Sequence, residues 1–295
     1  MTIAVIVSTY NRPDALAAVL EAFRTQRDRA FELIVADDGS TGETARVVDA
    51  FRGRADFPVV HVWHEDRGFR AGAIRNRAIA ATSADYVIFT DGDCLVLPGF
   101  VGEHRRLAEE GWFVAGSRIL LSEAFTRRIL SEPLSLPDAK ASAWFRAFVR
   151  RDINRLVPLV PLPLPGWGRK LSRNRWEGVM TCNLASWRED LLAINGFDEA
   201  YHGWGLEDSD LVIRLLRRGI GRKSARFAAP VFHLWHRAND RTLLAVSYTH
   251  LRAHETVLDL VCRLLLEKKN KTTPTSNLQL LLKHKIITPS HPTLT

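Results

Sequence analysis

Two carboxylates separated by a single glycine, Asp91 and Asp93, follow a short apolar run at residues 86–90 that predicts a buried strand. Carboxylate oxygens are the ligands that hard divalent cations such as Mg²⁺ and Mn²⁺ prefer, and these cations often accompany phosphate. Asp and Gly are also ordinary turn formers, so the triplet taken alone favours a turn. Its position at a strand end beside other polar strand ends favours a metal site instead.

Two other pairs of side chains could take part in the same chemistry. Glu207 and Asp208 begin a predicted helix, where carboxylates either complement the helix dipole or place a general base beside a substrate. His233 and His236 lie near the end of a predicted strand region at residues 227–235. A single histidine is more often structural than ligating, but a neutral imidazole can complete a metal shell begun by Asp93.

Alternating strands and helices must position these groups. Apolar runs at residues 3–7, 31–36, 59–63 and 86–90 predict buried strands, and the segments after Pro13, at 43–51 and at 71–81 predict helices. This alternation predicts right-handed βαβ units and a Rossmann-like, mostly parallel α/β sheet flanked by helices. Ligands bind such sheets outside the carboxyl ends of the strands. Three of the four strands end in polar loops (STYN, DDGS and TDGD), so we expect these loops to converge on one site.

The second half of the sequence begins with a stretch that has no clear pattern. Residues 119–175 contain a Leu/Val/Pro run at 156–165, two tryptophans and scattered arginines. They predict an irregular insert, which could be a lid, a membrane-facing segment or an irregular connection packed on the domain. After it, the sequence predicts a strand at 179–186, a helix at 187–194 and a helix at 206–218 that Gly219 closes.

The composition narrows the class of protein. The chain has 295 residues, 46% of them apolar, and a net charge of +8, which suits either anionic partners or a solvated basic surface. No nucleic-acid recognition motif accompanies the charge, so we expect no nucleic-acid partner. Three cysteines without CxxC spacing fit a reducing compartment. The apolar run at residues 3–7 is too short for a secretory signal and has no basic residue before it. We therefore expect a cytoplasmic protein, with the inner face of the cell membrane as an alternative location.

Seven short segments in order resemble family 2 glycosyltransferases of the GT-A fold, with a C-terminal part similar to the galactosyltransferase-type and chondroitin-polymerase-type catalytic segment. The segments are residues 5–13 (VIVSTYNRP), 35–41 (VADDGST), 72–76 (GAIRN), 89–93 (FTDGD), 195–199 (NGFDE), 203–208 (GWGLED) and 232–236 (FHLWH). The resemblance implies one GT-A domain over residues 1–245. It would comprise a nucleotide-binding half (1–118), a variable insert (119–175) and an acceptor and catalytic half (176–245).

The resemblance also implies roles for the matching residues. Ser8 and Tyr10 would line the nucleoside pocket, and Asp38 would bind the uracil. Arg75 would approach the base or the diphosphate, and Asp91 would contact the ribose or the metal. The remaining implied roles are Asp93 and His233 as ligands of Mn²⁺ or Mg²⁺ with His236 as the alternative, Asp208 as catalytic base, Glu207 as the group that holds the acceptor, and Trp204 as the residue that stacks on the sugar.

The implied reaction is an inverting transfer of a sugar from a nucleotide-diphosphate donor, expected to be a UDP-sugar. The acceptor would be a glycan or a lipid-linked molecule in cell-surface polysaccharide biosynthesis, with peripheral membrane contact. One alternative is a sugar-phosphate nucleotidyltransferase, but its glycine-rich loop after the first strand is missing from residues 8–12. A dinucleotide oxidoreductase would need G-x-G-x-x-G at that place. The other alternative is a catalytically inactive nucleotide-sugar-binding module, which the intact acidic residues disfavour.

Residues 246–295 differ from the rest of the chain. The segment 246–270 resembles a conceptual translation of sequencing-adapter DNA, and the last residues are rich in Thr, Pro and Lys. We therefore expect the native domain to end near residue 245. An amphipathic helix is the competing interpretation.

Overall fold

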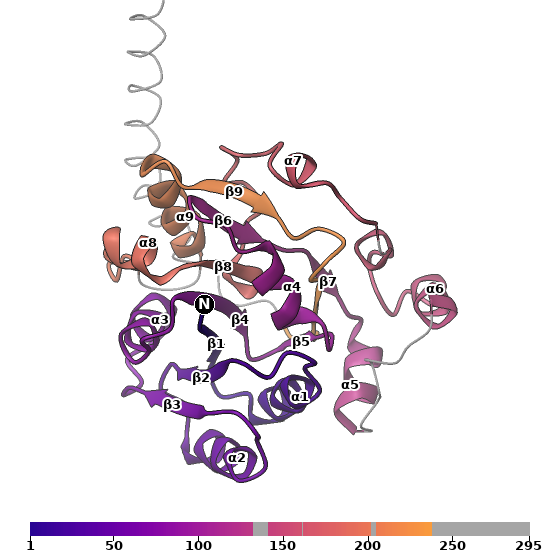
Figure 1. Cartoon of the computed structure of the whole chain (residues 1–295). Helices are drawn as coiled ribbons and strands as arrows, with labels where there is room; N and C mark the ends of the chain where they lie inside the picture. The colour runs from indigo at the N-terminus through magenta and orange to yellow at the C-terminus, as the bar shows by residue number, and fades with distance from the viewer. Residues whose placement is uncertain (132–140, 161, 202–204, 238–295) are drawn as a thin grey trace, which may run out of the picture. The chain divides into compact units, whose positions relative to one another are not determined.

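A computed structural model describes residues 1–131, 141–160, 162–201 and 205–237 (Figure 1). All of them belong to the first of two compact units, Met1–His254. Trp204 and the whole of residues 246–295 lie outside the described residues, so the interpretations given to them stay predictions. Within the described part of the chain, no helix is long and apolar enough to cross a membrane.

The centre of the fold is a seven-stranded sheet with the strand order β3-β2-β1-β4-β8-β6-β9. Its strands are β1 Ile3–Thr9, β2 Glu32–Asp37, β3 Val59–Trp63, β4 Tyr86–Asp91, β6 Trp112–Ala115, β8 Leu184–Trp187 and β9 Gly221–Ser224. Strand β8 pairs antiparallel with β4 and β6, and the other four pairs are parallel. The predicted mostly parallel α/β sheet is therefore confirmed.

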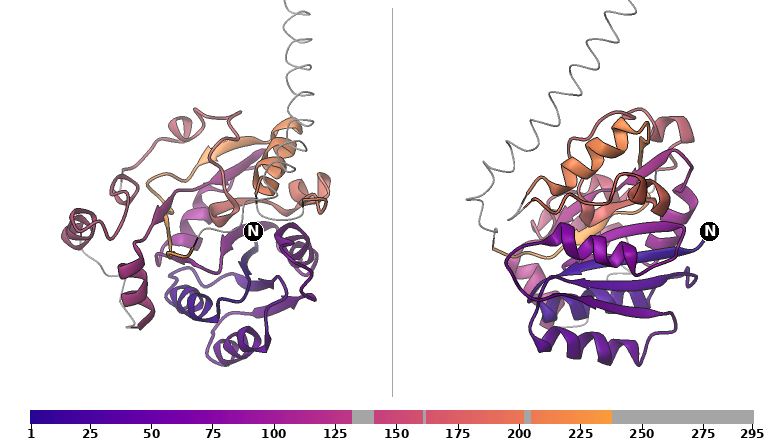
Figure 2. Two further views of the ribbon diagram at one scale, coloured as in Figure 1. Left: turned by 180° about the vertical axis from the view of Figure 1, so that it is seen from behind. Right: turned by 90° about the vertical axis from the view of Figure 1, so that its left-hand side faces the viewer.

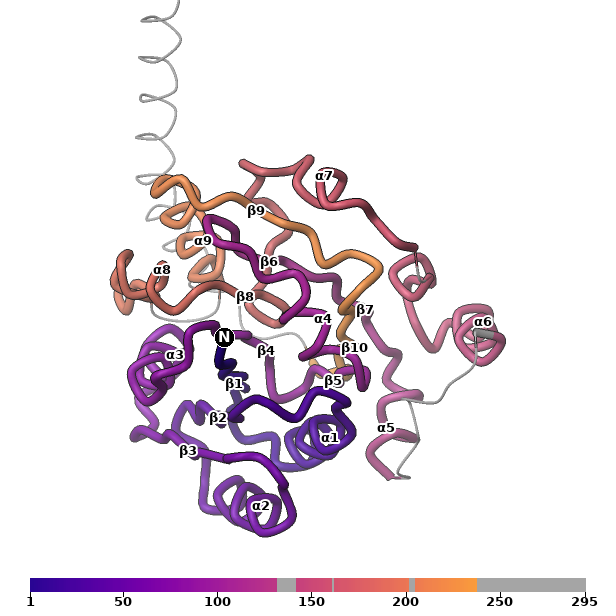
Figure 3. The backbone as a smooth tube through the Cα atoms, in the orientation of Figure 1, coloured from indigo at the N-terminus to yellow at the C-terminus, as the bar shows by residue number. Residues whose placement is uncertain are grey.

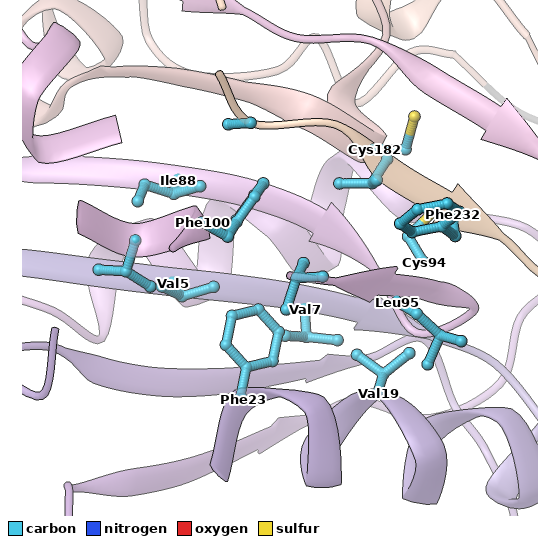
Figure 4. Close-up of a cluster of buried hydrophobic side chains, with 14 of the residues drawn as sticks. Val5, Val7, Val19, Phe23, Ile88, Cys94, Leu95, Phe100, Cys182 and Phe232 are labelled. Carbon is cyan, nitrogen blue, oxygen red and sulfur yellow. The ribbon is translucent and has the colours of Figure 1, made fainter. Parts of the chain in front are cut away.

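Alternation along the buried strands builds a core on each face of this sheet. In β1, Val5 and Val7 belong to one cluster of buried side chains, whereas Ala4 and Ile6 belong to the other. Successive strand residues point to opposite faces, so a continuous apolar run is what a sheet covered on both sides requires. Figure 4 shows part of the first cluster, between β1, β4 and the helix that contains Phe23.

Helices cover both faces of the sheet, as Figures 1 and 2 show. Helices α1 (Pro13–Arg24), α2 (Gly42–Arg52) and α4 (Phe100–Leu107) contribute to the first cluster, and α3 (Ala71–Ala80), α8 (Arg188–Ala193) and α9 (Glu207–Arg217) contribute to the second. Helix α1 begins at Pro13, whose fixed φ suits the first helical position. It buries Leu16, Val19, Leu20 and Phe23, a spacing that places them on one side of the helix.

A second, three-stranded sheet has the order β5-β10-β7. Its strands are β5 Cys94–Val96, β7 Arg118–Leu120 and β10 Val231–His233. Strand β10 pairs antiparallel with β5, which directly follows the Asp91–Asp93 loop (Figure 3). Directly after β10, the backbone N–H of Leu234 donates to the carbonyl oxygen of Asp93 at 2.8 Å. The small sheet thus brings the end of the described chain against the acidic loop.

Two predicted strands are shorter in the structure than the sequence indicates. At residues 179–186, a 3₁₀ turn over Thr181–Asn183 precedes β8, because the Asn183 N–H bonds back to the Met180 carbonyl. At residues 227–235 only Val231–His233 is a strand. Phe227 has a left-handed φ of 66°, and the N–H groups of Ala228 and Ala229 both bond to Ala225, so the chain turns there.

The expected irregular insert at 119–175 contains several helices. They are α5 (Glu123–Ser131), α6 (Ala141–Val149), the 3₁₀ helix η2 (Val157–Leu159) and the single turn α7 (Gly166–Arg169). Helix α6 is anchored to the first cluster by Trp144, whose ring stacks on Phe232 with centroids 4.7 Å apart. In both Figure 1 and the rear view of Figure 2, α6 lies at the outer side of this stretch, away from the seven-stranded sheet.

Candidate functional site

A buried arginine contacts side chains from three separate parts of the sequence. Arg75 lies on α3 and is 5% exposed. Its Nε donates to the Ser8 hydroxyl at 3.0 Å, and its terminal nitrogens contact Asp91 at 3.2 Å, Glu207 at 3.4 Å and Asp208 at 3.5 Å. The ends of β1 and β4 and the first turn of α9 therefore meet at one guanidinium, as the convergence of polar strand ends predicts.

The carboxylates around Arg75 have altered proton affinities. Burial raises the pKa of Asp91 to about 6 and that of Glu207 to about 7, although the nearby Arg75 charge acts in the opposite direction. Burial of Arg75 alone would lower its pKa, but the charges of Asp208, Asp91 and Glu207 outweigh this effect and raise it. Arg75 stays charged, and two of its partners can exchange protons near neutral pH.

Asp208 is held by a second element. Its Oδ2 accepts the backbone N–H of Thr181 at 3.0 Å, and its Oδ1 accepts the Thr181 hydroxyl at 2.7 Å. These bonds tie the first turn of α9 to the 3₁₀ turn before β8 and fix the carboxylate against Arg75. The side chain of Asp208 is 22% exposed, compared with 9% for Glu207, so it is the more accessible of the two.

The second group of polar side chains surrounds Asp93. The Nε2 atoms of His233 and His236 lie 3.6 Å and 3.4 Å from Asp93 Oδ2, and the two imidazole rings are 5.1 Å apart. Burial lowers the pKa of His233, which favours the neutral imidazole that a metal ion needs. One carboxylate and two imidazoles that converge in this way fit a divalent first-row ion. Both candidate histidines lie near Asp93, so both His233 and His236 remain candidate metal ligands.

Two buried thiols adjoin this loop. Ligand atoms of Asp91, Cys94 and Cys182 lie within 4.8 Å of one another, and so do those of Asp93, Cys94 and His233. Burial raises the pKa of the Cys94 thiol far above its usual value. A protonated thiol is a weak ligand, so the oxygen and nitrogen atoms are the better donors for a hard cation.

The end of β2 carries the side chain expected to read the nucleobase. Asp38 is 5% exposed, and its oxygens accept from His64 Nε2 at 2.6 Å and from the Arg70 backbone N–H at 2.8 Å. Each carboxylate oxygen has two lone pairs, so these bonds leave acceptor capacity. The same two bonds connect residues 64–70 to the end of β2, and the sequence did not indicate this structural role of Asp38.

Tyr10, directly after β1, contacts the same stretch of residues 64–70. The residue is 46% exposed, and its hydroxyl donates to Asp66 Oδ2 at 2.9 Å. The loop containing Asp66 approaches so closely that a Cβ on Gly39 would lie 2.5 Å from the Asp66 Cα, and Gly39 has a φ of +95°. Glycine is therefore required in the DDGS turn for steric as well as conformational reasons.

Sequence reasoning missed three residues that support the site: Thr181, Asp66 and Phe197. The Phe197 ring lies 5.4 Å from the Arg75 guanidinium carbon and belongs to the NGFDE segment, so that segment was the available signal. Thr181 and Asp66 stand in stretches where the sequence offers no comparable signal. The predicted residues Ser8, Arg75, Asp91, Glu207 and Asp208 form one cluster by direct contacts.

The mostly parallel seven-stranded sheet flanked by helices is a GT-A fold, the fold that its structural neighbours share. Residues 4–158, more than half of the chain, match the Glycosyl transferase family 2. Residues 169–237 match the N-terminal domain of galactosyltransferase. The chain belongs to glycosyltransferase family 2.

Similar characterised proteins include a validoxylamine A glucosyltransferase from Streptomyces hygroscopicus subsp. limoneus. It is 29% identical over 271 residues, which are 87% of this chain and 57% of that protein. A hyaluronan synthase from Pasteurella multocida is 26% identical over 227 residues (74% of this chain, 23% of the synthase), and a chondroitin synthase from Escherichia coli is 24% identical over 239 residues (74% and 32%). The chain therefore spans little more than half of the first relative and less of the two synthases.

Solved structures share the fold at low sequence identity. The mannosyltransferase PcManGT from Pyrobaculum calidifontis, in complex with GDP-Man and Mn²⁺, superimposes with a TM-score of 0.56 at 18% identity, over 80% of this chain and 57% of that one. TarS 1–349 from S. aureus, in complex with UDP-GlcNAc, gives a TM-score of 0.53 at 16% identity, over 81% and 60%.

Proposed function

We propose that this chain is an inverting, metal-dependent glycosyltransferase that moves a sugar from a nucleotide-diphosphate donor, a UDP-sugar, to an acceptor hydroxyl. The acceptor is a glycan or a lipid-linked molecule in cell-surface polysaccharide biosynthesis, at the inner face of the cell membrane. The observation that carries this proposal is the buried Arg75 in contact with Ser8, Asp91, Glu207 and Asp208. The UDP-GlcNAc and GDP-Man complexes of the two structural neighbours support a nucleotide-sugar donor.

Asp208 is the proposed catalytic base. The acceptor oxygen attacks the anomeric carbon, the bond to the diphosphate breaks, and its electron pair leaves on the phosphate oxygen. The acceptor proton goes to the Asp208 carboxylate, which Thr181 holds in a fixed orientation. Because one displacement inverts the anomeric centre, no second carboxylate is needed as nucleophile. Glu207, which is more buried, holds the acceptor.

The donor is proposed to lie along the ends of β1, β2 and β4. Ser8 and Tyr10 line the nucleoside site, Asp38 accepts the imide N–H of uracil, and Arg75 and Asp91 approach the diphosphate and ribose. The exposure of Tyr10 and the remaining acceptor capacity of Asp38 support this placement.

The cation is proposed to bind at Asp93 and His233, with His236 as a further ligand. A divalent ion held there supplies positive charge for the departing nucleoside diphosphate. Asp93 and the imidazoles would hold it near the end of β4, since the bond from the Leu234 N–H to the Asp93 carbonyl keeps β10 beside the loop.

Donor binding with and without metal tests this proposal. A panel of UDP- and GDP-sugars should be titrated into the protein by calorimetry with Mn²⁺ present and again with excess EDTA. We expect a UDP-sugar to bind with Mn²⁺ and its affinity to fall at least about tenfold on chelation, because the diphosphate then faces Asp91 and Asp93 without a counter-charge. Affinity that survives chelation would refute the metal role, and binding of no nucleotide sugar would refute the donor class.

Two variants provide the controls. Asp93→Asn should reproduce the effect of EDTA in the presence of Mn²⁺. Glu110→Gln removes an exposed carboxylate that follows α4 in the chain and should bind the donor as the wild type does.

A further inference from the structure

Helix α6 carries an apolar face that no described residue covers. Phe145, Phe148 and Val149 are 57%, 41% and 64% exposed. Their spacing of three and four residues places them on one side of the helix. Trp144 and Ala147, on another side, are buried in the first core cluster. The helix is therefore anchored through one face and presents a second apolar face to its surroundings, which in monomeric proteins marks an interaction surface.

Arginines without a described ion pair lie on α6 and in the residues just after it. Arg146, Arg150, Arg151 and Arg155 are all exposed, and none makes an ion pair with any residue that the structure describes. By contrast, Arg127 and Arg128 on the neighbouring α5 pair with Glu123 and Asp152. Residues 141–175 contain eight Lys and Arg against one Asp, a net charge of +7, while the whole chain has +8.

The apolar surface continues beyond α6. A hollow of about 510 Å³ lies at the C-terminal end of the helix, lined by Leu120, Leu121, Phe148, Val149, Ile153 and Arg151 among others. Further along the chain, Trp167 and Leu171 are 71% and 76% exposed. Exposed apolar side chains and cationic groups thus both occur between residues 145 and 173.

We propose that α6 and the arginines that follow it dock on an anionic phospholipid bilayer. The face of Phe145, Phe148 and Val149 enters the boundary between headgroups and acyl chains, and the arginines contact the lipid phosphates. A polyanion such as a nucleic acid would use the arginines alone and leave the apolar face exposed to water. The pairing of both features on one short helix favours the bilayer, and this inference stands independently of the proposed transferase activity.

Co-sedimentation of the full chain with vesicles tests the proposal. We expect binding to vesicles of phosphatidylcholine mixed with phosphatidylglycerol, and none to phosphatidylcholine alone. The double variant Arg150→Gln/Arg151→Gln should lower the bound fraction at least about tenfold. Phe145→Ser/Phe148→Ser should lower it similarly with all charges kept. These side chains are exposed, so both variants should keep the wild-type melting temperature.

The control is Arg24→Gln/Arg54→Gln, which removes the same charge from exposed positions on α1 and just after α2. It should bind anionic vesicles like the wild type. Three results would overturn the proposal: no binding to anionic vesicles, equal loss in both arginine pairs, or full binding by the phenylalanine variant, which would indicate a polyanion site instead.

Discussion

At the scale of single residues, the site depends on one buried cation and the carboxylates it gathers. The sequence predicted Ser8, Arg75, Asp91, Glu207 and Asp208 individually, because polar residues at strand ends and helix starts are visible in a sequence. It could not predict that the Arg75 guanidinium contacts all four others, since those contacts join residues up to 133 positions apart. Nor could it predict the pKa values, which arise from burial.

Arg75→Ala should destabilise the protein in a pH-dependent manner. Near pH 8 the carboxylates of Asp91 and Glu207 are ionised and buried, so losing their counter-charge should lower the free energy of unfolding by about 3–5 kcal/mol. Their folded pKa values of about 6 and about 7 lie above the unfolded values. Their protonation therefore stabilises the fold at low pH, and this contribution disappears as the pH rises through 6 and 7.

The drop caused by Arg75→Ala should accordingly be smaller near pH 5, where the protonated carboxyls need no counter-charge. Urea unfolding in EDTA at both pH values measures this difference. Arg127→Ala, at an exposed pair, should change stability by no more than about 0.5 kcal/mol. An equal drop for Arg75→Ala at both pH values would contradict the electrostatic account.

At the scale of elements, the strong periodic segments were predictable and the short ones were not. The first four strands and their helices agree with the structure to within a few residues, because the strands are continuous apolar runs and the helices repeat apolar residues at helical spacing. Strands β5, β6, β7 and β9 have three or four residues each and were not predicted. Strand β10, which brings His233 to Asp93, exists because it pairs with β5 and β7, and no local pattern encodes that pairing.

The Asp91–Asp93 loop is held closely against the end of β1. The Gly92 N–H donates to the Ser8 carbonyl at 2.6 Å, and a Cβ on Gly92 would lie 2.9 Å from the Cβ and Oγ1 of Thr9. Gly92→Ala must push the loop away from β1, since β1 is a central strand. We expect a loss of about 1–3 kcal/mol in stability and at least about a tenfold loss in Mn²⁺-dependent donor affinity.

Gly42→Ala is the matched control for this substitution. Gly42 begins α2 and has no neighbouring heavy atom within 4 Å of an added Cβ, so stability should stay the same or rise by up to about 1 kcal/mol. Thermal unfolding and donor calorimetry on both variants test the point. A Gly92→Ala protein that binds donor as tightly as Gly42→Ala would show that the loop position is unimportant.

At the scale of the whole molecule, the two segments that match the two family models contribute different parts of the site. Residues 4–158 supply Ser8, Arg75 and the acidic loop, and residues 169–237 supply Thr181, Glu207, Asp208 and the histidines. The guanidinium of Arg75 joins the two halves directly. The proposed division of labour is that the first half binds the donor and α9 from the second half performs the proton transfer.

The rate of transfer by Asp208→Asn is the most direct test of this account. The amide can still accept the Thr181 N–H, so donor affinity should stay within about twofold while kcat falls by about 10²–10⁴. Glu207→Gln is the comparison and should mainly raise the KM for the acceptor. Near-wild-type kcat in Asp208→Asn, or equal losses of kcat and donor affinity, would contradict the assignment of Asp208 as the base.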